Sequence, residues 1–202
     1  MSTSFIISCL VSLLALPCCC YGQPQKETVN FLAIQGPITV QKDAYHLVWS
    51  SHPDASLYKQ EYLTAGDRFP NYKSMITVDF VVTESSIDQA IATKVRQLDE
   101  LKKTNPIVNY EVIGNKATGE KIIDCLIGQT AADERNSVVE RDVFRYKVVK
   151  LASGHRGVLL FAVSQRKYGN DIKPFLLKLK TDKPILIGEV AKRPMPEINL
   201  SK

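Results

Sequence analysis

Apolar and polar residues alternate along many short segments of this chain, and a two-residue period predicts β-strands. The strongest such segment runs from Met75 to Val82, and most of the others are rich in β-branched and aromatic residues. The predicted strands span residues 28–34, 46–50, 58–63, 75–82, 107–113, 121–129, 138–151 and 157–166. Short turns separate the last four, and a parallel connection needs a dozen or more residues. We therefore expect these four to form an antiparallel meander.

Two segments follow a helical period instead. Between residues 87 and 101, apolar residues recur every three or four positions and charged residues fill most of the opposite side, which predicts an amphipathic helix. Ser85 is expected to cap this helix, and Asn105-Pro106 to end it. A second helix is expected to begin after Gly169-Asn170-Asp171 and to run through Leu179. Residues 184–190 are expected to form a last edge strand or a buried extended tail.

These elements predict an α+β fold: a mainly antiparallel sheet of about seven to eight strands with two principal helices packed on it. The helices should cover at least one face of the sheet, and the alternation within the strands suggests that the other face is partly solvated. With 45% hydrophobic and 23% charged residues, the composition is that of a globular protein. We expect one domain over residues 23–202, because no linker or repeat divides it.

The first 22 residues have the pattern of a secretory signal. Residues 5–20 carry no charge, and as a helix they would reach roughly 24 Å, less than the ~30 Å hydrocarbon core of a bilayer. A polar stretch begins at Gln23, so Gly22 is the expected last residue of the signal. The protein is therefore expected to be exported to the periplasm or the cell exterior. An uncleaved membrane anchor remains the alternative.

Cysteine positions add a second alternative for this leader. A lipid-anchored form through Cys18, Cys19 or Cys20 is conceivable, although the residue before a lipidated cysteine is usually small and Cys18 follows Pro17. Removal of the leader leaves only Cys125, so no internal disulfide can form. Cys125 lies in an apolar strand, which favours a role in core packing over one as a nucleophile. Its neighbour Asp124, on the opposite face, is expected to be solvated.

A family resemblance follows from two short sequences, Tyr62-Leu63-Thr64-Ala65-Gly66-Asp67 and Tyr72-Lys73-Ser74-Met75-Ile76-Thr77-Val78. They resemble a phrase of exported bacterial proteins in which a Pro-x-Gly-Glu turn leads to Asn-Trp-x-x-x-Leu-Thr-Val. Here Thr64-Ala65 replaces the proline and Tyr72 replaces the tryptophan. Over residues 40–182 the order of elements is similar to the PsbP-like superfold, which includes DcrB-type envelope proteins. The resemblance implies an accessory or binding protein and supplies no catalytic residue.

Motifs for enzymatic chemistry do not stand out. The chain has three histidines, His46, His52 and His155; if one strand carried the first two they would lie about 20 Å apart on one face, too far to share a metal ion. Residues 114–119 lack phosphate-loop spacing and predict a hairpin turn. We therefore expect no metal, no cofactor and no catalytic residue. The alternative is an enzyme whose site assembles only in three dimensions, from His46, His52, Asp54 or Asp124.

Basic residues concentrate toward the C-terminus. Between residues 145 and 193 there are twelve Lys or Arg and three Asp or Glu, whereas the whole chain has 26 and 21. A solvated face explains this pattern, and an anion-binding patch is the sharper hypothesis, with the candidate residues Lys147, Arg166, Lys167, Lys173, Lys178 and Lys180.

The resulting prediction is an exported, non-catalytic accessory or binding protein of the periplasm or cell envelope. Its partner would be an unidentified protein or an anionic envelope component. Peripheral membrane contact is left open, and an anion-binding surface module is the second alternative. Nucleic acid is not expected as a partner, because the chain lacks a strand platform of aromatic and basic residues.

Overall fold

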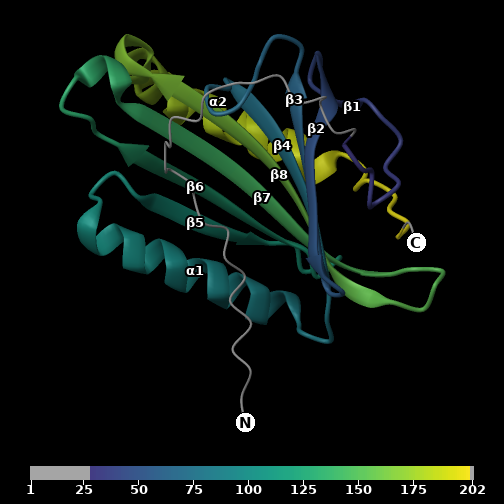
Figure 1. The fold of residues 1–202 in the computed structure, drawn as a ribbon. Coiled ribbons are helices and arrows are strands. Elements are labelled where there is room, and N and C mark those ends of the chain that lie inside the picture. Colours follow the sequence, from purple (N-terminus) through teal and green to yellow (C-terminus); the bar gives the residue numbers. More distant parts are fainter. Residues whose placement is uncertain (1–27, 201–202) are drawn as a thin grey trace.

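One eight-stranded antiparallel sheet and two long α-helices form the fold of residues 28–200, the part of the chain that the computed structural model describes (Figure 1). The predicted leader, including Cys18, Cys19 and Cys20, lies outside the described residues. Within them, no helix is long and apolar enough to span a membrane. The strands are β1 (Ile38–Val40), β2 (Asp43–Asp54), β3 (Leu57–Thr64), β4 (Ser74–Val82), β5 (Asn109–Gly114), β6 (Lys121–Gln129), β7 (Val138–Lys150) and β8 (Arg156–Tyr168), and the helices are α1 (Ile87–Thr104) and α2 (Ile172–Lys192).

The sheet consists of two meanders joined in the middle. Its strand order is β1-β2-β3-β4-β8-β7-β6-β5, and every neighbouring pair is antiparallel. After β4 the chain passes through α1 to the far edge, and the second meander returns from β5 to place β8 beside β4 (Figure 1). The expected α+β class, the number of strands and the β5–β8 meander are confirmed.

The two helices pack on opposite faces of the sheet. Ile91 and Leu98 of α1 pack with Ile123 and Phe144, whereas Leu186 of α2 packs with the neighbours of those two sheet residues, Ile122 and Val143. Successive strand residues point to opposite faces, so these two sets define an α1 face and an α2 face. The prediction that helices cover at least one face is confirmed. However, the other face is covered as well, by α2, and is not simply solvated.

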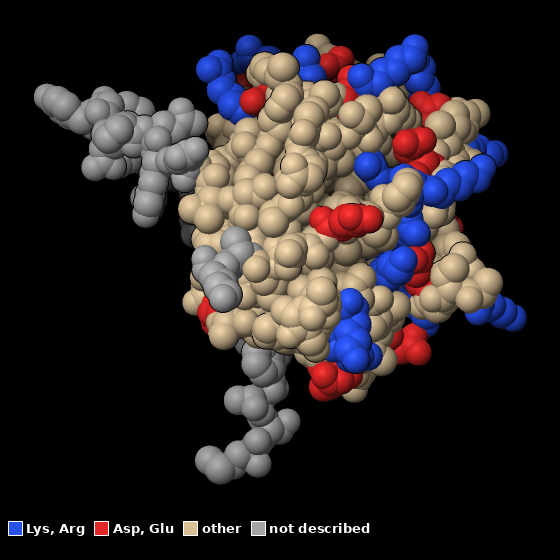
Figure 2. All heavy atoms as spheres, turned by 90° about the vertical axis from the view of Figure 1, so that its right-hand side faces the viewer, with Lys and Arg blue, Asp and Glu red and all other residues tan. Residues whose placement is uncertain are grey.

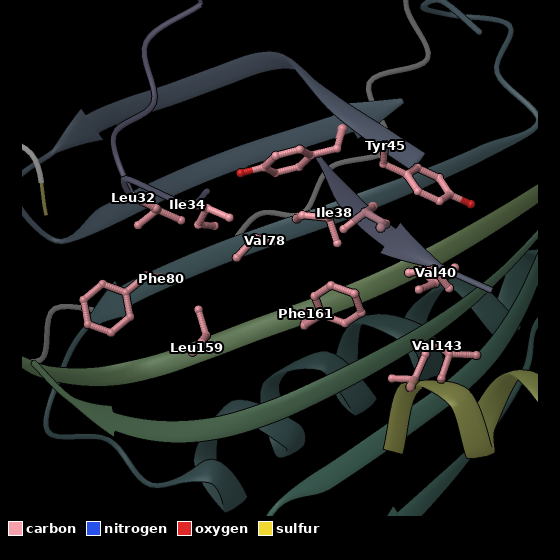
Figure 3. Close-up of a cluster of buried hydrophobic side chains, with 14 of the residues drawn as sticks. Leu32, Ile34, Ile38, Val40, Tyr45, Val78, Phe80, Val143, Leu159 and Phe161 are labelled. Carbon is pink, nitrogen blue, oxygen red and sulfur yellow. The ribbon is translucent and has the colours of Figure 1, made fainter. Parts of the chain in front are cut away.

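The larger apolar core lies on the α2 face (Figure 3). Val78, Phe80, Leu159 and Phe161 from the two central strands are all almost completely buried there. The chain before β1 closes this core from the side, and it was predicted to be a strand over residues 28–34. That prediction is wrong. The Asn30 side chain bonds the backbone N–H and C=O of Ile34, forming a local turn that replaces ladder hydrogen bonds.

Two predicted helix features also need correction. The N-cap of α1 is Ser86 rather than Ser85, and Ser86 forms a reciprocal capping box with Gln89. Residues 184–190 are not an edge strand or an extended tail, because α2 continues through Pro184 to Lys192. Leu186 and Val190 stand four positions apart, so both face the sheet, and their burial holds this half of the helix in place.

Buried arginines of β7 fasten this half of α2 to the sheet. Arg141 donates to Asp124 at 2.7 Å and to the backbone C=O of Lys183 at 2.9 Å. Arg145 donates to Glu120 and, through Nη1, to the C=O of Val190 at 2.8 Å. Each guanidinium therefore joins a buried carboxylate of the sheet side to main-chain oxygens of the helix, which satisfies charges that would otherwise be costly to bury.

Candidate functional site

A groove of about 200 Å³ lies between α1 and the α1 face of the sheet. Its floor is formed by β4, β7 and β8, and its wall by the first three turns of α1. The helix sits over β5, β6 and β7, so the groove opens where α1 leaves the central strands β4 and β8 uncovered. Most of the lining is apolar, including Val81, Ala90, Phe144, Val158 and Leu160.

Asp79 is the acidic residue of this lining. It belongs to β4 and is only 5% exposed, and one of its oxygens, Oδ2, lies 3.6 Å from Nζ of Lys59 on the adjacent strand. The other oxygen, Oδ1, is buried with no hydrogen-bond partner among the described residues. Burial raises the pKa of Asp79 to about 6, although the nearby amino groups of Lys59 and Lys94 oppose this shift. The groove therefore contains a carboxylate with unused hydrogen-bonding capacity.

Lys94 supplies the positive charge of the groove. Its Nζ lies 4.4 Å from the centre of the Phe144 ring, a cation–π distance, and its side chain is only partly exposed. The groove is thus largely apolar, with one buried acceptor group on the sheet and one ammonium group on the helix. This combination suits a small molecule with an apolar body and a polar end.

Further carboxyl groups share the α1 face with Asp79. Asp142 is buried on β7, where Ser164 Oγ donates to it at 2.6 Å and Cys125 Sγ lies 3.8 Å away. Burial first, and the charge of Glu140 second, raise the pKa of Asp142 to about 7. Burial likewise raises the pKa of Glu61 to about 6. Acidic groups with raised pKa values thus gather on one face of the sheet.

Cys125 is buried, and burial and the nearby Asp142 raise the pKa of its thiol well above the ordinary value. A thiol that stays protonated is a poor nucleophile, so the expected packing role agrees with this environment. Among residues 28–200 there is no group of three or more His, Cys, Asp or Glu side chains arranged to hold a metal ion.

The residues of the alternative acid–base site, His46, His52, Asp54 and Asp124, do not come together in the structure. His46 pairs with Leu63 on the α1 face, whereas His52 stacks on Tyr58 of the α2-face core, because a bulge in β2 shifts the register between them. The expectation that both histidines share one face is therefore wrong. Asp54 is exposed at the end of β2, where its carboxylate accepts a hydrogen bond from the backbone N–H of Ser56 in the β2–β3 turn.

Asp124 was expected to be solvated, and that is also wrong. It lies buried beneath α2, with Arg141 at 2.7 Å and Lys183 at 3.3 Å. β6 turns this residue toward the α2 face, where the helix excludes water. Two buried or partly buried cations compensate the carboxylate, which gives it a structural role.

The six candidate anion-binding residues divide between the two faces of the sheet, with Arg166 on the α1 face and the other five on the α2 side. Arg166 is on the α1 face, where it pairs with Glu140 at 2.6 Å and lies over the Tyr72 ring at 4.0 Å. Lys147 lies 3.5 Å from Glu120. Lys167 is a partly exposed residue of β8, next to a hollow that also reaches Leu186 of α2. The other three, Lys173, Lys178 and Lys180, are exposed on α2.

Asp79 was not predicted as a site residue. The signal was present in the sequence: a single carboxylate in the otherwise uncharged strand Met75 to Val82. In a strand of alternating apolar and polar residues, such a carboxylate is interpreted as one polar residue on the solvated face. Its burial depends on where α1 returns across the sheet, which the pattern of β4 does not contain.

The geometry defines an α+β sheet protein with a largely apolar groove beside α1 on one face of its sheet. A family model matches residues 32–195, and the chain therefore belongs to that family, which is an uncharacterised one. No curated protein matches the sequence.

Proposed function

We propose that this protein is an exported, non-catalytic binding protein, and that the groove beneath α1 is its ligand site. The observation that carries the proposal is the unpartnered Oδ1 of Asp79 in a mainly apolar groove. A buried acceptor without a hydrogen bond costs about 1–3 kcal/mol, and a ligand that donates to it would recover part of this cost. Binding sites commonly combine apolar walls with a few such polar groups.

The size of the groove limits its ligand. An apolar cavity of ~150 Å³ accepts benzene, so about 200 Å³ suits a body of roughly two fused rings or a short alkyl chain. The buried carboxylate disfavours anions near it. We therefore propose a small, mainly apolar ligand with an O–H or N–H donor at one end.

Export and the accessory role are part of the same proposal. They are supported by the uncharged 16-residue stretch near the N-terminus and by the resemblance of residues 40–182 to the PsbP-like superfold. Cell fractionation with intact mass measurement tests this part. Loss of residues 1–22 from protein found outside the cytoplasm would support it, an added lipid mass would mean anchoring, and an intact cytoplasmic chain would contradict it.

Calorimetric titration of the full chain with 2-naphthol, 2-methoxynaphthalene and naphthalene-2-carboxylate tests the groove. The three compounds share one apolar body, but only the first retains an O–H donor at pH 7. We expect 2-naphthol to bind about ten times more tightly than the ether, and the carboxylate to bind weakest.

Two alanines of α1 provide a matched pair of variants. Ala90 lines the groove, whereas Ala92 is exposed and is not part of the lining. Ala90→Phe should fill the groove and abolish 2-naphthol binding, while Ala92→Phe should leave it unchanged. Equal loss in both variants, or no naphthol binding by the unsubstituted protein, would contradict the proposed site.

A further inference from the structure

The outer side of α2 combines exposed apolar residues with lysines. Leu177 is 73% exposed and Ile185 is 61% exposed, and these two are the most exposed large hydrophobic residues of the described chain. The lysines Lys173, Lys178, Lys180 and Lys192 of the same helix are also exposed. This surface is independent of the groove, because α1 and α2 lie on opposite faces of the sheet.

Helix geometry places these side chains on one side of α2. With about 100° per residue, the four lysines and Ile185 all fall within ~100° of Leu177 around the helix axis. The acidic residues Asp182 and Glu189 lie farther round, at ~140° and ~120°. The outer side is therefore basic, with aliphatic residues among the lysines.

The opposite side of the helix is already occupied. Leu186 and Val190 are buried in the core, and the main-chain oxygens of Lys183 and Val190 accept hydrogen bonds from the arginines of β7. The attachment of α2 thus uses its inner side and its C-terminal half. Leu177 lies on the other side of the helix, 73% exposed, and is available to contact a partner.

Figure 2 shows how charged residues are distributed on one side of the molecule. In this view from the β1–β2 side, uncharged residues cover a broad area to the left and centre, and charged residues of both signs lie mainly to the right and along the top. The right of this view corresponds to the rear of Figure 1, the side of the sheet on which α2 packs.

We propose that the outer side of α2 docks on an anionic membrane surface, with its lysines at the lipid headgroups and Leu177 and Ile185 entering the boundary of the acyl chains. Charge complementarity supports lipid as the partner: α2 carries five lysines against one aspartate and one glutamate. Basic helices with exposed aliphatic residues bind membranes in this way, through electrostatic attraction together with buried apolar area.

Sedimentation with vesicles tests this proposal. The full chain is mixed with vesicles of phosphatidylcholine alone or with 30% phosphatidylglycerol, at low and high salt. The double variant Lys178→Glu/Lys180→Glu removes two positive charges from α2. Its matched control, Lys102→Glu/Lys116→Glu, makes the same change of net charge at two exposed positions, one on α1 and one in the β5–β6 turn. Residues 1–22 are present in every sample, so their contribution is the same throughout.

We expect the α2 double variant to bind acidic vesicles at least tenfold more weakly than the unsubstituted protein, because each lysine near such a surface contributes about a fivefold gain. The control should change binding by less than twofold. Leu177→Gln should weaken binding several-fold, and this loss should persist at high salt, since it removes apolar contact rather than charge.

Three results would overturn the proposal. The control double variant could lose as much binding as the α2 variant, which would reveal a non-specific charge effect. Binding could be independent of phosphatidylglycerol. Finally, dextran sulfate could show the α2-dependent binding while acidic vesicles do not, which would assign the helix to a soluble polyanion. Circular dichroism confirms that each variant remains folded.

Discussion

Asp142 allows a quantitative test of the acidic groups on the α1 face. Its carboxyl is almost fully buried, and burial raises its pKa from 3.8 to about 7. Asp142→Asn keeps the size of the side chain and an oxygen that can accept from Ser164 Oγ, and removes the charge. The substitution should therefore stabilise the protein at high pH, where the buried carboxyl must ionise.

The direction and size of this change in the free energy of unfolding follow from proton linkage. A carboxyl with a raised pKa binds its proton more tightly in the folded state, so its stabilising effect is complete below pH 4 and is lost as the pH rises through about 7. At ~1.4 kcal/mol per pKa unit, the total loss is about 4 kcal/mol, as an upper bound. Roughly 2 to 3 kcal/mol of it falls between pH 5 and pH 8, because the unfolded chain is already mostly ionised at pH 5.

Urea unfolding at pH 5 and pH 8, followed by far-ultraviolet circular dichroism, measures this difference. The free energy of unfolding of Asp142→Asn, relative to the unsubstituted protein, should rise by about 2 to 3 kcal/mol from pH 5 to pH 8. Asp133→Asn is the control: Asp133 is exposed, and hydrogen bonds from Arg135 lower its pKa, so it stays ionised throughout this range. An equal relative stability of Asp142→Asn at both pH values would refute the reasoning.

Three further substitutions or reactions probe the packing. Gly157→Ala should destabilise the fold by several kcal/mol in urea unfolding, because the new Cβ would lie 2.2 Å from the backbone oxygen of Val81, whereas Gly114→Ala has open space and should change stability little. Arg145→Met should cost about 3–5 kcal/mol by the same assay, since it leaves the buried Glu120 with only the half-exposed Lys147, 3.5 Å away, as a partner. Cys125 should react with a thiol reagent only after denaturation; a fast reaction of the native protein would contradict its burial.

Much of the fold could be predicted from periodicity. Strands from Met75 to Val82 and from Lys121 to Gln129 have clear patterns, and the helix from Ile87 has apolar residues at helical spacing; all three lie where they were expected. Short turns between successive strands also predicted the second meander. These features depend on local sequence, which is why the pattern was sufficient.

The features that the sequence pattern did not predict depend on tertiary contacts. Pro184 suggested an end to helical structure, yet α2 continues through it because Leu186 and Val190 bury their side chains against the sheet. Asp124 and Arg141 look like solvated residues of alternating strands, and only the position of α2 shows that they form a buried pair. The groove at Asp79 was missed for a similar reason, since it depends on α1 packing beside the central strands, over β5, β6 and β7.

The attachment of α2 has a consequence for how this protein tolerates sequence change. Arg141 and Arg145 reach main-chain oxygens of the helix, at Lys183 and Val190, and every amino acid supplies such an oxygen. The fastening therefore does not depend on which side chains the outer surface displays. Substitutions on the outer side of α2 could therefore introduce new binding specificities, while the hydrogen bonds from Arg141 and Arg145 keep the helix in place on the sheet.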